Sequence, residues 1–252
     1  MIIDTHCHLS KNDYDNLDEI INYFPGYLIT AGVDDKTNLE VIELVDKYDN
    51  LFGVIGIHPE EVKNVTDKSF KIIEENIKNN KIIGIGEIGL DYHYGKDDIE
   101  LQKEIFIKQL DLARKYHLPV VIHSRDSILD TYNILAQYKD VKKVMHCFSS
   151  SLEMAREFIK IGCLLGIGGT LTFKNNKKLV EVVENLDIRN FVLETDSPWL
   201  SPEPFRGQKN VPGNIFYVAK KISEIKNIDV EKVIEITSQN IISQFDLKIK
   251  MW

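Results

Sequence analysis

Two histidines near the start of the chain have the spacing of a metal-binding pair. His6 and His8 close an apolar run, Ile2–His8, that has the composition of a β-strand. Because side chains alternate across a strand, both imidazoles share one face and Cys7 points to the other. Imidazole is a good ligand for first-row transition metals, so the pair predicts part of a metal site. The same alternation predicts that the thiol of Cys147 also points away from the ligands.

Four further imidazole and carboxylate side chains follow apolar runs later in the chain. These residues are Glu87, His123, His146 and Asp196. An unpartnered charge at the end of a buried strand is costly, and a hydrogen-bonded strand-end residue is the alternative explanation for any one of them. Together with His6 and His8, however, they supply enough ligands for two divalent ions if one carboxylate bridges. The set of six therefore predicts a metal site.

Eight short apolar runs must position these side chains. The runs are Ile2–His8, Tyr27–Val33, Leu51–Ile57, Ile82–Glu87, Pro119–His123, Lys142–His146, Cys163–Ile167 and Phe191–Asp196. They are almost continuously apolar, which is typical of parallel strands covered on both faces, and amphipathic helical patterns lie between them. This order predicts an α/β fold, a (β/α)8 TIM-like barrel with extra C-terminal helices; a doubly wound open sheet is the alternative. Barrel active sites are built at the carboxyl ends of the strands, where the six residues fall.

The length and composition agree with one enzyme domain. The 252 residues are 43% apolar, and no linker, repeat or low-complexity segment interrupts them, so we expect a single domain over residues 1–252. The 39 acidic and 31 basic residues give a net charge of −8, which excludes a basic protein that coats nucleic acid. An enzyme that binds phosphate locally is still compatible with this charge.

Cysteine usage and the first residues predict a cytoplasmic protein. The three cysteines, Cys7, Cys147 and Cys163, are too few and too far apart for a disulfide framework. No apolar run approaches the roughly 20 residues of a membrane span, and the first residues lack the basic and apolar regions of a signal peptide. We therefore expect no membrane association, and no pattern indicates an obligate protein partner.

Several short segments occur in the order typical of a known family. They are Asp4–Leu9, Gly56–Pro59, Gly86–Tyr92, Val121–Asp126, His146–Ser149, Glu194–Leu200, Arg206–Pro212 and Gln239–Ile241. Together they resemble the TatD family of metal-dependent hydrolases, within the amidohydrolase superfamily, over essentially the whole chain. The sequence departs from the family pattern at Val211, where glutamate is usual, and at Trp199, where tyrosine is common. Both departures concern substrate preference and not the predicted ligands.

The resemblance implies a binuclear centre. One ion would be held by His6, His8 and Asp196 and the other by His123 and His146, with Glu87 bridging. The resemblance also implies a deoxyribonuclease that removes nucleotides from the 3′ ends of DNA, so DNA strand ends are the expected partner. We expect two divalent ions per chain as cofactors; imidazole favours Zn²⁺, while phosphoryl chemistry and the two carboxylates also suit Mn²⁺ or Mg²⁺.

The two expected ions would change the local charge of the site and the acidity of a bound water. Two divalent ions bring positive charge into a small pocket and reverse the local field of an acidic protein, so that a DNA end can enter. They lower the pKa of a bound water toward roughly 7 and contact the attacking and leaving oxygens. We expect Asp196 to accept the proton of the water, and Glu87 to take part in catalysis as the bridging carboxylate.

Two residues beside the ligands are expected to contact the substrate. His58 follows the third run, where the resemblance implies a substrate contact; a histidine held by its own turn is the alternative. Arg125 lies two residues after His123 and is placed to bind a phosphate through two parallel hydrogen bonds. An ion pair between Arg125 and a nearby carboxylate is the alternative.

Loop residues complete the expected substrate surface. Arg206, together with Lys209, is expected to form a basic rim for a nucleic-acid strand, with a solvated loop as the alternative. One residue of the segment 91–93 is expected to face the substrate. We expect Trp199 to pack against the final helices, with stacking on a base as the alternative.

Two other functions fit the same ligands. An enzyme of the same superfamily could instead cleave an amide, a lactone or an ester, because one fold and metal set serve many chemistries. A metal-stabilised protein that binds nucleic acid without turnover is the second alternative, and it predicts a closed coordination shell. Six ligands shared by two ions leave coordination positions open, which favours an enzyme.

Overall fold

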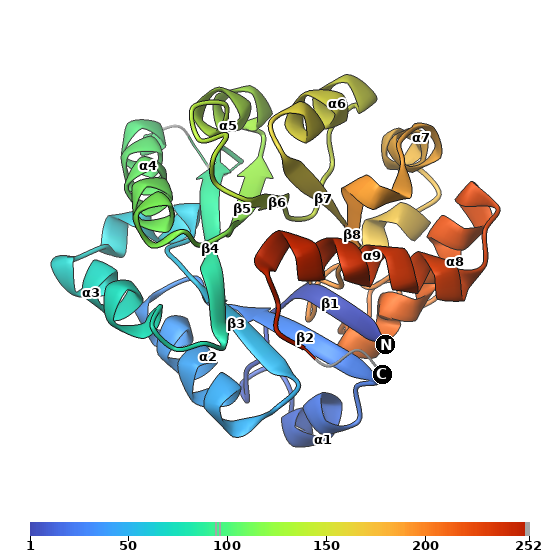
Figure 1. The fold of residues 1–252 in the computed structure, drawn as a ribbon, viewed down its shortest axis with the longest axis horizontal. Coiled ribbons are helices and arrows are strands. Elements are labelled where there is room, and N and C mark those ends of the chain that lie inside the picture. The colour runs from blue at the N-terminus through green and yellow to red at the C-terminus, as the bar shows by residue number, and fades with distance from the viewer. Residues whose placement is uncertain (94, 96, 250–252) are drawn as a thin grey trace.

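Eight parallel strands form one sheet in the computed structural model, which describes residues 1–93, 95 and 97–249 (Figure 1). The strands are β1 (Ile2–Cys7), β2 (Gly26–Ala31), β3 (Leu51–Ile55), β4 (Ile82–Asp91), β5 (Val120–Arg125), β6 (Lys143–Met145), β7 (Cys163–Ile167) and β8 (Phe191–Leu193). Each strand pairs in parallel with the next one along the chain. The strand order confirms the predicted (β/α)8 TIM-like barrel and differs from a doubly wound sheet, in which the order reverses.

Helices follow the strands and form the outer layer of the barrel. They are α1 (Leu17–Asn22), α2 (Asp35–Lys47), α3 (Asp67–Asn76), α4 (Ile99–Tyr116), α5 (Ile128–Leu135), α6 (Leu152–Lys160), α7 (Lys177–Asn185), α8 (Ile215–Lys226) and α9 (Val230–Phe245), with short 3₁₀ helices η1 (Pro59–Asn64), η2 (Gly169–Thr172), η3 (Ile188–Asn190) and η4 (Pro212–Asn214). Each strand is followed by one of the helices α1 to α8, so among the described residues α9 is the extra C-terminal helix. In the parts of the chain that the structure describes, no helix has both the length and the apolar character that crossing a membrane requires.

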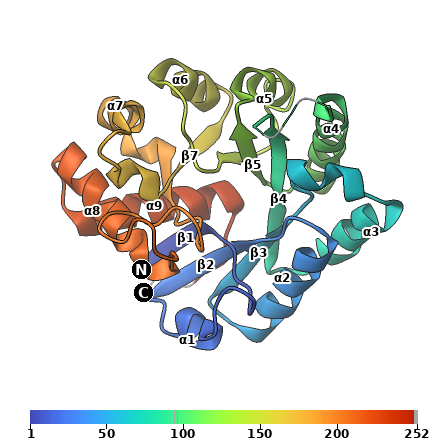
Figure 2. The ribbon, with the colours of Figure 1, turned by 180° about the vertical axis from the view of Figure 1, so that it is seen from behind.

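The apolar core has two parts, separated by the sheet. The outer part lies between the strands and the helices and includes Ile2. The inner part lies inside the barrel and includes Ile3, the next residue of the same strand. The inner part also contains Ile83 near the start of β4, together with Ile241 and Phe245 of α9. Helix α9 therefore closes the end at which the strands begin (Figure 1). The view from behind shows the opposite end, where the segment between β8 and α8 lies beside β1 (Figure 2).

The barrel closes between β1 and β8 through hydrogen bonds beyond the short last strand. The Asp196 N–H donates to the His6 carbonyl at 2.9 Å, and the His8 N–H donates to the Ser197 carbonyl at 2.7 Å. The Thr5 hydroxyl donates to the Leu193 carbonyl at 2.9 Å, deeper in the same seam. This closure places Asp196 beside the two histidines of β1.

A buried hydrogen bond across this seam predicts a loss of stability in Thr195→Val. The Asp4 carboxylate, which is 0% exposed, accepts the Thr195 N–H at 2.9 Å and the Thr195 hydroxyl at 2.6 Å. Valine keeps the volume and the N–H but removes the hydroxyl, so one buried oxygen of Asp4 loses this donor. We expect the free energy of unfolding to fall by about 1–3 kcal/mol. Urea denaturation in the presence of a chelator measures this change, and an unaltered midpoint would contradict it.

The strands nearest in sequence to the two predicted carboxylate ligands, β4 and β8, end at residues other than those that the sequence indicated. Strand β4 continues four residues past Glu87 to Asp91, so Glu87 lies inside the strand. Gly89 allows this continuation, because its φ is +148° and a Cβ there would lie 1.9 Å from the His123 carbonyl oxygen. Strand β8, by contrast, ends at Leu193, three residues before Asp196. One carboxylate is therefore presented by a strand and the other by the segment that follows a strand.

Candidate metal centre

Four of the predicted ligands meet beside the carboxyl end of β1. His6 Nε2 lies 3.1 Å from His8 Nε2 and 3.2 Å from Glu87 Oε2. Asp196 Oδ1 lies 3.6 Å from His8 Nε2 and 3.9 Å from His6 Nε2. Two ligand atoms that each contact a tetrahedral ion at about 2.1 Å lie roughly 3.4 Å apart. The spacing of these donor atoms therefore suits a divalent ion.

The other oxygen of Glu87 faces a second pair of histidines. His123 Nδ1 lies 2.8 Å from Glu87 Oε1, and His146 Nε2 lies 3.8 Å from the same oxygen. His146 Nε2 also lies 3.6 Å from Asp196 Oδ1. The two oxygens of Glu87 are thus divided between the histidines at the end of β1, His6 and His8, and the histidines within β5 and directly after β6, His123 and His146. This division is the arrangement expected of a bridging carboxylate.

The hydrogen bonds and surroundings of His6 and His8 also fit a bound cation. His8 Nδ1 lies 3.1 Å from the Ala31 carbonyl, which can only accept, so in the neutral ring Nδ1 carries the hydrogen and Nε2 keeps its lone pair. That lone pair faces His6 and Glu87, which are 1% and 3% exposed. Lone pairs and carboxylate oxygens that converge in a buried site need a proton or a metal ion between them. The residues present therefore fit divalent ions.

Burial and charge act against each other on the second pair of histidines. Burial lowers the pKa of His146, but the charges of Glu194 and two further carboxylates outweigh burial and raise the pKa to about 10. Burial also lowers the pKa of His123, whereas hydrogen bonds with Asp91 and Glu87 raise it to about 9. In the metal-free protein, protonated histidines therefore balance the charge of the carboxylates.

These pKa values predict that metal binding releases protons at pH 7. His123 and His146 are protonated in the metal-free protein at this pH, because it lies below their pKa values of about 9 and 10. A ligating nitrogen must be unprotonated, so we expect up to two protons to leave. The apparent metal affinity should then weaken by up to about tenfold per proton for each unit that the pH falls. Calorimetry in buffers of different ionisation enthalpy counts the protons, and a count of zero would contradict this expectation.

A left-handed turn brings an unexpected thiol to the site. Cys147 has a φ of 45°, which ends the alternation of side chains after β6. Its sulfur lies within 4.8 Å of ligand atoms of His146 and Glu194. The alternation rule therefore does not describe Cys147, and the prediction that its thiol points away from the ligands stays a prediction. The Cys7 thiol, by contrast, donates to the Ile29 carbonyl at 3.4 Å within the core.

The structure places His58, a predicted substrate contact, against the ligands. His58 Nε2 lies 3.5 Å from Glu87 Oε1, and its ring centre lies 4.4 Å from that of His123. His58 Nδ1 accepts the Glu60 N–H at 3.2 Å. In the neutral ring Nε2 must then carry the hydrogen, so it faces the centre as a donor. His58 also forms, with Glu87 and His123, a group whose ligand atoms lie within 4.8 Å of one another and could hold an ion.

The predicted basic residues lie on the surface around the strand ends. Arg125 is the last residue of β5 and is exposed. Arg206 is exposed on the segment after β8, and its guanidinium lies 4.3 Å from the centre of the Phe173 ring. Lys209 of the same segment lies 5.7 Å from the centre of the Tyr14 ring. Aromatic rings thus support two cationic side chains of this segment.

Trp199 does not pack in the core, and that prediction is wrong. Its side chain is 55% exposed, and its ring centre lies 4.9 Å from that of His8. Its backbone is held on both sides, because its N–H donates to the Asp196 carbonyl at 2.9 Å and its carbonyl accepts the Asn210 amide at 2.7 Å. The structure therefore presents an exposed indole beside a predicted ligand.

Sequence reasoning missed the contacts of two buried acids. Asp91 Oδ2 lies 2.9 Å from His123 Nε2, and Glu194 Oε1 lies 3.2 Å from His146 Nδ1. Asp91 was predicted only as one member of the segment 91–93, and Glu194 was not predicted at all. The sequence did offer one indication of these contacts. Both residues are carboxylates beside buried apolar runs, where a charged group must find a partner.

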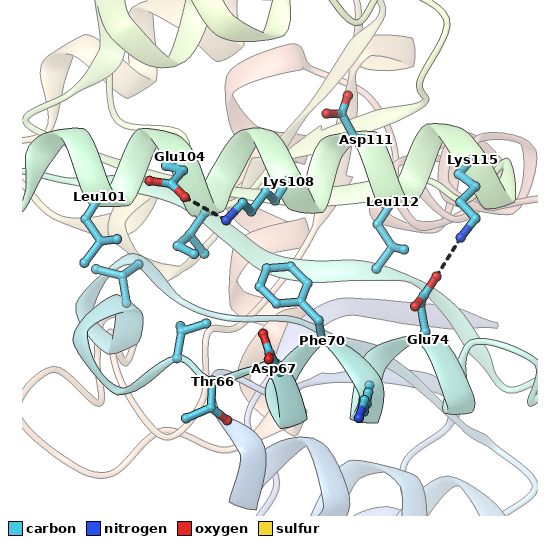
Figure 3. Close-up of a pocket in the computed structure, with 14 residues that line it drawn as sticks. Thr66, Asp67, Phe70, Glu74, Leu101, Glu104, Lys108, Asp111, Leu112 and Lys115 are labelled. Carbon is cyan, nitrogen blue, oxygen red and sulfur yellow. Dashed lines mark hydrogen bonds and ion pairs between the residues drawn. The ribbon is translucent and has the colours of Figure 1, made fainter.

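A groove of about 800 Å³ lies elsewhere, on the outer layer between η1, α3 and α4 (Figure 3). Apolar side chains such as Phe70 line it, and ion pairs stand at its edges. Lys108 pairs with Glu104 and Lys115 pairs with Glu74, each at 2.7 Å. None of the predicted site residues belongs to the lining that the structure describes, so this groove is separate from the metal centre.

The barrel, with histidines and carboxylates converging at the carboxyl ends of its strands, defines a metal-dependent hydrolase. A family profile described as TatD related DNase matches residues 3–246. The chain belongs to this family.

Relatives and solved structures match over nearly their full lengths. The chain is 38% identical over 247 residues to a Bacillus subtilis protein named as the uncharacterized metal-dependent hydrolase YabD, covering 95% of this chain and 97% of the relative. It is 35% identical over 244 residues to a similarly named protein of Methanocaldococcus jannaschii, covering 94% of each. The crystal structure of the TatD homologue YJJV from Escherichia coli has a TM-score of 0.90 at 28% identity and covers 98% of both chains.

Proposed function

We propose that the protein is a deoxyribonuclease that hydrolyses phosphodiester bonds at the 3′ ends of DNA with two divalent ions. The observation that carries the proposal is the position of Glu87, whose two oxygens face two separate pairs of histidine nitrogens. Paired ions bridged by a carboxylate suit an in-line displacement at phosphorus. The description of the family as a DNase supports DNA as the substrate.

The same six residues hold the ions in this proposal. His6, His8 and Asp196 would hold one ion, His123 and His146 would hold the other, and Glu87 would be shared between them. When bound, the ions supply positive charge that attracts a phosphodiester and makes a water molecule more acidic. Imidazole nitrogens favour Zn²⁺, and the carboxylates also accept Mn²⁺ or Mg²⁺.

Asp196 is the proton acceptor in this proposal. Its Oδ1 lies 3.6 Å from both His8 Nε2 and His146 Nε2, and its side chain is 13% exposed. Burial raises the pKa of Asp196, but the charge of His146 and the interactions with His8 and His6 together outweigh burial and leave the pKa below its ordinary value. Asp196 is therefore ionised at pH 7 and is able to take a proton from water and pass it to the leaving 3′ oxygen.

His58 and the arginines hold the substrate in this proposal. His58 Nε2–H faces the centre and donates to a phosphate oxygen that does not react. Arg125 at the end of β5 is placed to bind the same or the next phosphate, because a guanidinium offers two parallel donors. Arg206 contacts the strand further from the reacting bond.

A nuclease assay with matched substrates tests the proposal. Metal-stripped protein is reloaded with Zn²⁺, Mn²⁺ or Mg²⁺ and incubated with 5′-labelled single- and double-stranded oligonucleotides. We expect products that shorten by one nucleotide at a time from the 3′ end, and a phosphorothioate at the last linkage should delay them. Aryl ester and lactone substrates are assayed in parallel. Turnover on those substrates with none on DNA would replace the proposal with a hydrolase of carboxyl derivatives.

The exposed indole beside His8 predicts a preference for an unpaired terminal nucleotide. A base that stacks on Trp199 must first leave the duplex stack, and such stacking contributes about 1–3 kcal/mol per base. We therefore expect Trp199→Ala to raise KM for single-stranded DNA by roughly 5- to 160-fold with little change in kcat. Trp199→Phe, which keeps an aromatic face, should retain most of the affinity. Equal KM values for the wild type and Trp199→Ala would exclude stacking at this position.

A further inference from the structure

Asp91 and Glu194 are buried carboxylates that lie behind two of the predicted ligands. Asp91 is 4% exposed, and its Oδ2 lies 2.9 Å from Nε2 of His123. Glu194 is 0% exposed, and its Oε1 lies 3.2 Å from Nδ1 of His146, which is within ion-pair distance. The geometry does not make this contact a hydrogen bond within the described residues. Both nitrogens are the ones remote from Glu87. Each acid therefore contacts a histidine on the side away from the centre.

Neighbouring groups hold both acids in place. The Gln102 side chain of α4 accepts the Asp91 N–H at 2.9 Å and donates to the Asp91 carbonyl at 2.8 Å. Glu194 Oε1 accepts the Cys147 N–H at 2.6 Å. Gly166 of β7 leaves room for Glu194, because a Cβ at that position would lie 2.2 Å from Oε2. The fold thus fixes a negative charge behind each of the two histidines.

The histidines of β1 have no such carboxylate at their remote nitrogens in the part of the chain that is described. His8 Nδ1 faces the uncharged Ala31 carbonyl at 3.1 Å. His6 Nδ1 is buried and has no hydrogen-bond partner within residues 1–93, 95 and 97–249. The two sides of the centre therefore differ in the charge that lies behind their ligands.

We infer that Asp91 and Glu194 are positioning residues that strengthen binding of the ion at His123 and His146 and leave the ion at His6 and His8 unaffected. The inference rests on the two-ion centre of the proposed function. A carboxylate at the remote nitrogen fixes which nitrogen carries the hydrogen, holds the orientation of the ring and makes the ligating nitrogen a better donor.

Asp91→Asn and Glu194→Gln test the inference, because each amide keeps the size of the acid and removes its charge. Metal-stripped full-length protein is titrated with Zn²⁺ against a chromophoric chelator, which resolves two dissociation constants. The variants His123→Ala and His6→Ala identify the side of the centre to which each constant belongs. We expect each acid variant to weaken the constant that is lost in His123→Ala by about 10- to 100-fold and to leave the other within about twofold.

Asp130→Asn is the matched control. Asp130 accepts the Tyr92 hydroxyl at 2.8 Å and pairs with Lys103 at 3.0 Å, in the same region of the barrel. Both dissociation constants should be unchanged in this variant. Thermal unfolding of the stripped proteins verifies folding, and Asp91→Asn alone decides the matter if Glu194→Gln does not fold.

The possible outcomes separate this inference from the proposed function. Unchanged constants in a folded acid variant, or equal weakening of both constants, would overturn the inference and leave the two-ion centre standing. A wild-type protein that binds a single ion would overturn both. The titration uses no DNA, so failure of the nuclease assay alone does not affect it.

Discussion

Asp196→Asn is expected to lower kcat by about 10²–10⁴ at saturating metal, the usual contribution of a positioned acid or base. Asparagine keeps the shape of the side chain and one oxygen, but it removes the charge and the proton acceptor. Asp196 has a left-handed φ of 55°, which asparagine adopts as readily as aspartate, so the backbone should be preserved. KM for DNA should change little, because the lost interaction develops only during the reaction. Steady-state kinetics on a 5′-labelled oligonucleotide measure both constants.

Asp246→Asn is the matched control for this substitution. Asp246 also has a left-handed φ, 51°, but it follows α9, at the other end of the barrel. Its kcat should equal that of the wild type. If Asp196→Asn keeps a near-normal kcat with full metal occupancy, Asp196 takes no part in proton transfer.

Glu87→Gln is expected to reduce the metal content from two ions per chain to one. The side chain is 3% exposed, and its two oxygens face separate pairs of histidine nitrogens. An amide replaces one of these oxygens with a group that has no lone pair to offer, so one side of the centre loses its shared ligand. Each ion contributes several kcal/mol to the transition state, so kcat/KM should fall by about 10²-fold or more.

Elemental analysis after reconstitution and dialysis measures the stoichiometry. Glu231→Gln, at an exposed position in the first turn of α9, is the control and should retain two ions. A wild-type protein that saturates with one ion, and keeps it in Glu87→Gln, would rule out a bridging role for Glu87.

The fold and the convergence of the six residues could be predicted from the sequence because both depend on strand topology. Nearly continuous apolar runs that alternate with amphipathic helices permit few arrangements, and a parallel barrel brings all carboxyl strand ends together. Glu87 and His123 follow different runs and are 36 positions apart, yet their side chains lie at 2.8 Å. The order of the runs was sufficient to predict that such residues meet.

Other features of the site could not be predicted, because they depend on local backbone geometry. The contact of Asp91 with His123 requires β4 to continue past Glu87, with a register shift between Ile85 and Ile88 against β5. The position of the Cys147 thiol follows from a left-handed turn at a residue other than glycine, for which the sequence carries no clear signal. Alternation rules apply only within a strand.

The seam between β1 and β8 has a consequence for the order in which the barrel forms. The hydrogen bonds that close it join Asp196 to His6 and His8 to Ser197, so the first strand is completed only by residues near the end of the sequence. Contacts between such distant residues form late in folding, because a very long loop must close first. An ion held by His6, His8 and Asp196 would cross-link this seam and, at a hundredfold excess over its dissociation constant, add about 2.7 kcal/mol to stability. The centre would then assemble only in a completed ring, and loading with metal would slow the reopening of that ring.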